Sequence, residues 1–186
     1  MMTLKRKEDG FTGLEAAIVL IAFIVVAAVF SYVMLGAGFF TTQKSQETIY
    51  SAIGQAATNM EVSGPVILKT GTDSKVAFAN FTLILAAGGN PVDITKVVYT
   101  VSTQQGIREL DYDNVKGGLR WFNNNSNTLL ERGEIIDVGI SSGNGANLIE
   151  ANLPFTIEVK PAVGASLPIT RYAPLSFAAN SIYEVY

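Results

Sequence analysis

The chain of 186 residues contains no histidine and no cysteine. This composition excludes zinc sites of the Cys/His type, thiol nucleophiles and Ser-His-Asp triads. Two carboxylates could still act as the acid and base of a glycosidase, and the candidates are Glu109, Asp111, Glu131, Glu134 and Asp137. Nothing in their spacing separates them from ordinary surface charge. The sequence therefore predicts no catalytic residue, no enzyme activity and no cofactor.

A short acidic segment offers oxygen ligands for a hard cation. Asp111, Asp113 and Asn114 lie close together, and Ca²⁺ prefers carboxylate and carbonyl oxygens. The rest of an ordered calcium loop is missing, so a solvated turn explains the segment better. We expect no metal site.

Two Asn-x-Ser/Thr sequons could accept a glycan, one at Asn80 and the other at Asn124. Asn124 lies in the polar stretch NNNSN, where a bulky sugar is tolerated. Asn80 lies in a strand-like segment whose alternation does not assign it to a face. Chance occurrence explains either sequon alone equally well, but exposure outside the cell favours glycosylation of both.

The element that organises the chain is an apolar run near the N-terminus. No charged residue occurs from Ala16 to Phe40, a stretch of 25 residues. As a helix this stretch is about 37 Å long, which is enough to cross a hydrocarbon core of about 30 Å. Lys5, Arg6 and Lys7 precede it and predict a cytoplasmic N-terminus, with the rest of the chain directed outward.

The apolar run allows three kinds of processing. A secretory signal has an apolar region of about 7–15 residues, which is shorter than this run, although Gly36, Ala37 and Gly38 imitate a cleavage site. An uncleaved membrane anchor fits the length. The third alternative is cleavage between Gly10 and Phe11, which leaves the helix on the mature protein.

The segment after the run predicts a helix that continues to Met60, followed by strands. The polar residues from Thr41 to Glu47 contain no breaker, and Ser63-Gly64-Pro65 then ends the helix. Beyond that point, short alternating segments with glycine turns predict a β-sandwich or barrel. The clearest core faces are Val97, Tyr99 and Val101; Ile136, Val138 and Ile140; and Phe155, Ile157 and Val159. The expected domains are a leader at 1–10, a helix at 11–60 and a β-domain at 61–186.

The N-terminal segment resembles a class III signal peptide, as found in archaeal flagellins (archaellins) and, more distantly, in type IV pilins. The resemblance rests on three basic residues, an acidic pair, Gly10 at the junction and Glu15 at the fifth position of the product. The continuation AAIVLIAFIVVAAVFSYVMLGAGFFTTQKSQE is similar to archaellins rather than to bacterial pilins. The specific match extends from about Lys5 to Glu47.

The resemblance implies an α+β fold, in which a long apolar helix precedes an all-β sandwich of the Ig-like or Greek-key type. It also implies removal of residues 1–10 by a preflagellin-type signal peptidase, with Phe11 and Glu15 at subunit contacts and glycans on Asn80 and Asn124. The membrane-inserted precursor is expected to polymerise on a membrane assembly and motor platform into an extracellular filament for swimming. The alternatives are a pilin-like adhesion filament and a membrane-anchored binding module. The acidic net charge of −3 argues against nucleic-acid binding.

Overall fold

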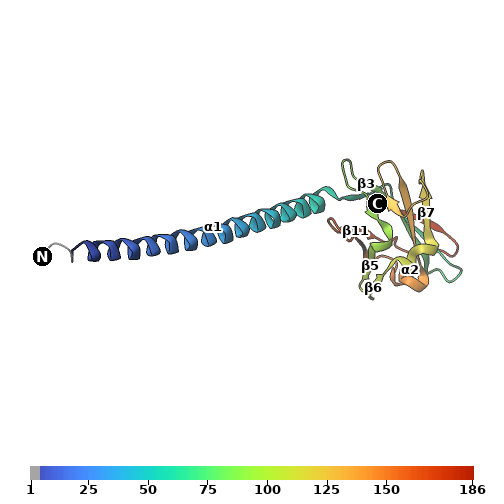
Figure 1. The fold of residues 1–186 in the computed structure, drawn as a ribbon. Coiled ribbons are helices and arrows are strands. Elements are labelled where there is room, and N and C mark those ends of the chain that lie inside the picture. Colours follow the sequence, from blue (N-terminus) through green and yellow to red (C-terminus); the bar gives the residue numbers. More distant parts are fainter. Residues whose placement is uncertain (1–4) are drawn as a thin grey trace. The chain divides into compact units, whose positions relative to one another are not determined.

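The computed structural model describes residues 5–186, with side chains from Thr12 onward, and divides the chain into two units (Figure 1). The first unit extends to Ser51 and consists of most of helix α1 (Lys5–Ala57). The second unit, Ala52–Tyr186, holds all of the strands. The expected α+β class, a long N-terminal helix followed by a β-sandwich, is confirmed.

Helix α1 ends at Ala57, three residues before the predicted end at Met60. The carbonyl oxygen of Gly54 accepts hydrogen bonds from both the N–H and the hydroxyl of Thr58, at 3.1 and 2.8 Å. Met60 then begins strand β1 (Met60–Val62), where it pairs with Leu85 and is buried in the core. The prediction was wrong here because Met60 continues the helical spacing of apolar residues, although in the structure it pairs with a strand.

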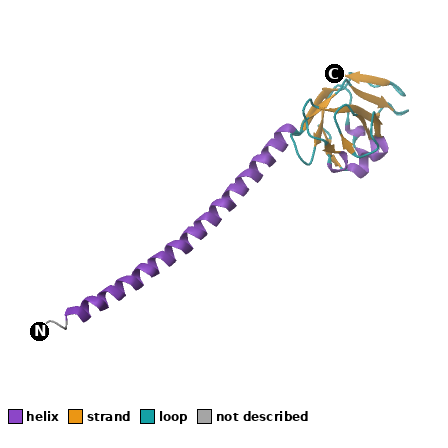
Figure 2. Cartoon of the chain, turned by 45° about the horizontal axis from the view of Figure 1, so that its top comes forward, coloured by secondary structure: helices purple, strands orange, loops and turns teal. Residues whose placement is uncertain are grey.

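The second unit is built mainly from two antiparallel sheets, and Figure 2 shows its strands in orange. The six-stranded sheet has the order β12-β2-β3-β9-β7, with β1 also paired to β3. Its strands besides β1 are β2 (Val66–Thr70), β3 (Val76–Leu85), β7 (Leu119–Phe122), β9 (Ile135–Ser141) and β12 (Ile182–Val185).

The four-stranded sheet has the order β11-β10-β5-β6. Its strands are β5 (Val98–Thr103), β6 (Gly106–Leu110), β10 (Pro154–Lys160) and β11 (Leu167–Tyr172). A two-stranded ribbon joins β4 (Val92–Asp93) to β8 (Leu129–Leu130). The short helical segments are α2 (Tyr112–Val115), η1 (Ile94–Lys96), η2 (Lys116–Gly118), η3 (Ser142–Asn144) and η4 (Ala146–Leu148).

One hydrophobic core lies between the two larger sheets. The three alternating faces predicted from the sequence are all buried in it, as expected for strands with one face toward a core. Phe81 of the six-stranded sheet packs near Tyr99 of the four-stranded sheet, with ring centroids 6.3 Å apart. This core holds the strands in a fixed register and therefore determines which residues share an outer surface.

Candidate assembly surface

The largest feature that the fold leaves uncovered is the apolar surface of α1. Within Thr12–Ala57, α1 contains an 18-residue segment that is apolar enough to cross a membrane. The mean hydropathy of this segment is 2.9, and none of its residues is buried. The large apolar side chains of α1 up to Phe40 lie on all sides of the helix, and all of them are exposed: Leu14, Ile18, Val19, Leu20, Ile21, Phe23, Ile24, Val25, Val26, Val29, Phe30, Tyr32, Val33, Met34, Leu35, Phe39 and Phe40. Burying one such side chain contributes about 1.5–3 kcal/mol. The helix therefore requires lipid or other protein around its whole circumference.

The surface that can be buried extends past Phe40, because the hydroxyl groups of the next two threonines are hydrogen-bonded to the backbone of the helix. Thr41 donates to the carbonyl oxygen of Ala37 at 2.8 Å, and Thr42 donates to that of Gly38 at 2.9 Å. Each hydroxyl is thus paired within the helix, which removes most of the cost of burying it. An ion pair between Lys44 and Glu47 follows, at 2.6 Å. Thr12 to Thr42 can therefore be buried without leaving these hydroxyls unpaired.

Small residues allow another helix to approach α1 closely. Gly36 and Gly38 have no atom within 4 Å of the position that a Cβ would occupy, so their surface is open. Small residues permit close backbone contact between apolar helices, where van der Waals packing drives association. This part of α1 is suited to packing against other helices.

The predicted N-terminal site is described only in part. The junction between Gly10 and Phe11 lies in the backbone of α1, and the side chains up to Phe11 are outside the described residues. Glu15 is exposed, and its carboxylate has no hydrogen-bond or ion-pair partner among the residues that the structure describes. A carboxylate in an apolar environment costs roughly 2.5 kcal/mol or more unless it is paired, so burial of this helix requires a cationic partner for Glu15.

The two sequons have different surroundings. Asn80 lies in the middle of β3, between Ile67 of β2 and Gly139 of β9. Its Nδ2 donates to Oδ2 of Asp137 at 3.2 Å, and the side chain is half-buried. The structure thus assigns Asn80 to the face of the six-stranded sheet that points away from the core.

Asn124 lies in a loop that is ordered by its own side chains. Its Oδ1 accepts from the N–H of Ser126 at 2.7 Å, and its Nδ2 donates to the carbonyl oxygen of Asn127 at 3.2 Å. Buried Glu134 accepts the N–H groups of Asn125 and Glu131, at 3.1 and 2.9 Å. One of the candidate glycosidase carboxylates therefore holds this loop in place.

The segment proposed for a hard cation caps a helix. Asp111 accepts the N–H of Asn114 at 3.2 Å, and Asn114 accepts the N–H of Asp111 at 3.1 Å, which forms a capping box for α2. Strand β6 ends at Leu110, directly before this capping box. Asp113 accepts a hydrogen bond from Lys116 at 2.8 Å, which raises the pKa of Lys116. Among the described residues, no group of three His, Cys, Asp or Glu side chains could hold a metal ion.

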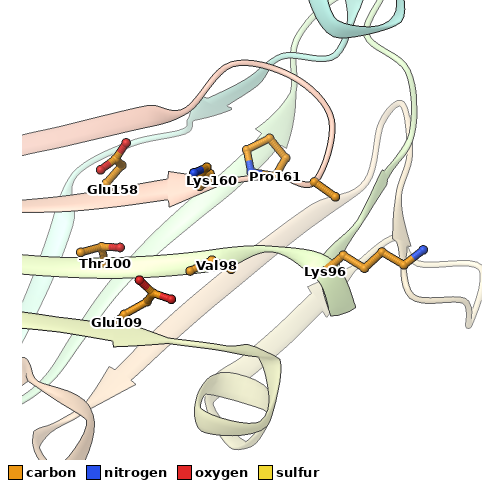
Figure 3. Close-up of a pocket in the computed structure, with 8 residues that line it drawn as sticks. Lys96, Val98, Thr100, Glu109, Glu158, Lys160 and Pro161 are labelled. Atoms are coloured by element: carbon orange, nitrogen blue, oxygen red, sulfur yellow. The ribbon is translucent and has the colours of Figure 1, made fainter. Parts of the chain in front are cut away.

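An open pocket of about 450 Å³ lies on the outer face of the four-stranded sheet, as Figure 3 shows. Glu109 and Glu158 lie on either side of Thr100, which is their partner in the strand register. Lys96 and Lys160 also line the pocket. These groups are exposed or half-buried, and the arrangement provides neither an enclosed site nor a nucleophile beside a base.

Comparison with known proteins provides the remaining evidence. The family model described as archaeal-type flagellin matches residues 10–171. The protein called "Probable flagellin 1" of Archaeoglobus fulgidus is 44% identical over 193 residues, which cover 94% of this chain and 95% of that protein. The solved archaeal flagellum of Methanospirillum hungatei has a TM-score of 0.75 at 37% identity and covers 93% of this chain and 98% of its own. The crystal structure of a flagellin from Methanocaldococcus jannaschii, at 11% identity and a TM-score of 0.57 over 68% of this chain and 95% of its own, shares the fold.

Proposed function

Because the chain belongs to the archaeal-type flagellin family and is a structural subunit of the archaellum filament, we propose that it reaches the filament as a membrane-inserted precursor. The observation that carries this proposal is the exposed apolar surface of α1 from Thr12 to Thr42. Such a surface is stable in lipid before assembly and among other helices afterwards. Both environments are apolar, so the transfer does not expose the helix to water.

A preflagellin-type signal peptidase cuts the precursor between Gly10 and Phe11. The basic leader before the apolar helix and membership of the archaeal-type flagellin family support this proposal. Cleavage creates an α-amino group on Phe11 that is largely cationic at neutral pH. This amine is the partner that Glu15 needs, supplied by a neighbouring subunit in the helical bundle.

Assembly takes place on a membrane platform that also holds the motor, and the β-domains form the outer surface of the filament. A subunit that contacts its neighbour through two different surfaces produces an open helical polymer. The rotating filament then propels the cell.

Of the two sequons, Asn124 is the better glycan acceptor. It lies in a loop rather than within a strand, and Ser126 two residues on is exposed. Asn80 uses its Nδ2 in the bond to Asp137 and lies between strands on both sides. A sugar on either asparagine requires that the hydrogen bond of its Nδ2 be broken, the bond to Asp137 for Asn80 and the bond to the carbonyl oxygen of Asn127 for Asn124.

Substitution at the cleavage junction tests the processing. Gly10→Leu replaces the small residue before the cut, and we expect the heavier precursor to accumulate in the membrane fraction with few filaments released. Gly13→Ala is the matched control, because a Cβ at Gly13 meets no atom within 4 Å and the junction is unchanged. Normal processing of Gly10→Leu to a product that begins at Phe11 would contradict the role assigned to Gly10, and a mature subunit that retains residues 1–10 would contradict the cut itself.

A further inference from the structure

The two larger sheets of the β-domain end in edge strands, β12 and β7 in one sheet and β11 and β6 in the other. The longest of these four is β11, with six residues, whereas β6 has five and β7 and β12 have four each. An edge strand leaves a row of backbone N–H and C=O groups unpaired, and such a row can pair with a strand of another molecule. Among these four strands, β11 therefore offers the most backbone for strand pairing between molecules.

Alternate residues of β11 direct their backbone groups toward β10 and toward the open edge. Ala173, directly after β11, donates its N–H to the carbonyl oxygen of Leu153 at 3.0 Å, so the odd-numbered residues face β10. The backbone groups at the open edge consequently belong to Pro168, Thr170 and Tyr172, and all three residues are exposed. A strand added to this sheet would have to bond to these three residues.

Two of the backbone groups at this edge are not available for pairing. Pro168 has no N–H, and proline occurs in sheets where the missing N–H would face an open edge. The carbonyl oxygen of Thr170 already accepts a hydrogen bond from Nη1 of Arg171, at 2.9 Å. An approaching strand would therefore lack a donor at 168 and would meet an occupied acceptor at 170.

Arg171 lies on the core side of this edge strand. Its register partner on β10 is Phe155, which is buried, and a charged side chain on the inner face of an edge strand opposes pairing with another strand. The Nε of Arg171 is buried and has no hydrogen-bond partner among the residues that the structure describes. An unpaired buried donor costs stability, so the stability of the domain does not explain an arginine at this position.

We infer that Pro168 and Arg171 close the edge of β11 and thereby prevent β-domains from pairing strand to strand. Chains that share a membrane through α1 bring their β-domains to a high effective concentration, at which even a weak edge contact would be occupied. Closure of the longest edge directs self-association to surfaces other than this strand. The inference goes beyond the assembly proposed above, because it concerns the β-domain alone and does not depend on cleavage after Gly10.

The test measures self-association of full-length subunits in detergent by analytical ultracentrifugation. Pro168→Thr restores an N–H at the open edge, Arg171→Thr frees the carbonyl oxygen of Thr170, and a double variant combines the two changes. Arg108→Thr is the matched control. Arg108 lies opposite buried Val101 on the other edge strand of the same sheet, and it makes no hydrogen bond or ion pair among the described residues. The control removes the same charge without freeing a backbone group.

We expect the double variant to self-associate at least about tenfold more tightly than the unsubstituted chain, because two backbone groups at the edge become available for hydrogen bonding. Arg108→Thr should associate no more than the unsubstituted chain. Hydrogen exchange identifies the contact: the N–H groups of Thr170 and Tyr172 should exchange rapidly in the unsubstituted chain and become protected in the associated double variant. Arg171→Thr alone should keep or raise the urea midpoint, and it should show a smaller increase in association that decides the question if the double variant does not fold.

A folded double variant that associates no more than the unsubstituted chain would overturn the inference. An equal increase in Arg108→Thr would also overturn it, because this would indicate an effect of charge rather than of the β11 edge. A clear loss of stability in Arg171→Thr would show that the arginine supports the fold instead of closing the edge. Filament formation is not measured in this experiment, so failure of the filament function and failure of this inference are distinguishable.

Discussion

Val29 lies in the middle of the uncharged part of α1, and the change Val29→Asp places a carboxylate there. The Val29 side chain is 59% exposed in the single subunit, so the substitution has little to disturb within one chain. In the proposed filament, the same side chain is surrounded by helices of other subunits. The effect should therefore appear in assembly and not in the fold of the β-domain.

The expected cost has two parts. Loss of a buried valine removes about 1.5 kcal/mol of apolar stabilisation. An aspartate at the centre of an apolar helix adds about 2.5–3.5 kcal/mol. Together these effects disfavour burial of α1, relative to exposure to water, by about 4–5 kcal/mol, both in lipid before assembly and among other helices afterwards.

The assay compares the amount of filament released from cells with the amount of subunit in the membrane fraction. Ser45→Asp is the matched control, because Ser45 lies in the polar segment that contains the Lys44–Glu47 ion pair. We expect few or no filaments from Val29→Asp and near-normal filaments from Ser45→Asp. The membrane fraction shows whether Val29→Asp still inserts. Filaments of normal yield and normal melting temperature from Val29→Asp would refute the burial of α1 by other subunits.

Three further predictions concern the β-domain and are read from the fluorescence of Trp121, the only tryptophan, during urea unfolding of full-length subunits in detergent. Gly118→Ala should lower the unfolding free energy by about 3 kcal/mol, because its Cβ would clash with the backbone carbonyl of Gly139; an unchanged value would contradict the close approach of these strands. Tyr99→Phe should raise the unfolding free energy by about 1–3 kcal/mol, because the buried hydroxyl has no hydrogen-bond partner among the described residues. A clear loss of stability would show that this hydroxyl is bonded. Asp93→Ala should cost about 1 kcal/mol near pH 7, because Asp93 caps η1 through Thr95. Hydrogen bonding by the Thr95 side chain lowers the pKa of Asp93 below its ordinary value of 3.8, so this contribution is present above that value and disappears as pH falls through the lowered pKa. A difference from the unsubstituted chain that persists at lower pH would contradict this assignment.

Much of the architecture follows from simple sequence patterns. The long uncharged run predicted α1, and period-two alternation predicted which residues of β5, β9 and β10 enter the core. These predictions succeed because burial against one core imposes a period on the sequence. The end of α1 was predicted too late, because Met60 continues the helical spacing of apolar residues but belongs to β1, which pairs with β3.

The surroundings of the candidate sites could not be predicted in the same way. Asn80 and Asp137 are 57 residues apart in sequence, and only the register of β3 with β9 brings them together. The capping role of Asp111 and Asn114 depends on four residues that also resemble part of a cation loop. Adjacent apolar residues such as Ile135 and Ile136 signal that both faces of a strand are apolar, but they do not identify what covers the second face.

The most direct test of the account is the N-terminal sequence and intact mass of subunits taken from native filaments. We predict that the chain begins at Phe11 and retains all of α1, so that the apolar helix lies in the filament core. A chain that begins at Met1 or Met2 would indicate an uncleaved membrane anchor. A chain that begins near Phe39 would indicate ordinary secretion with loss of the helix, and either result would contradict the proposed assembly.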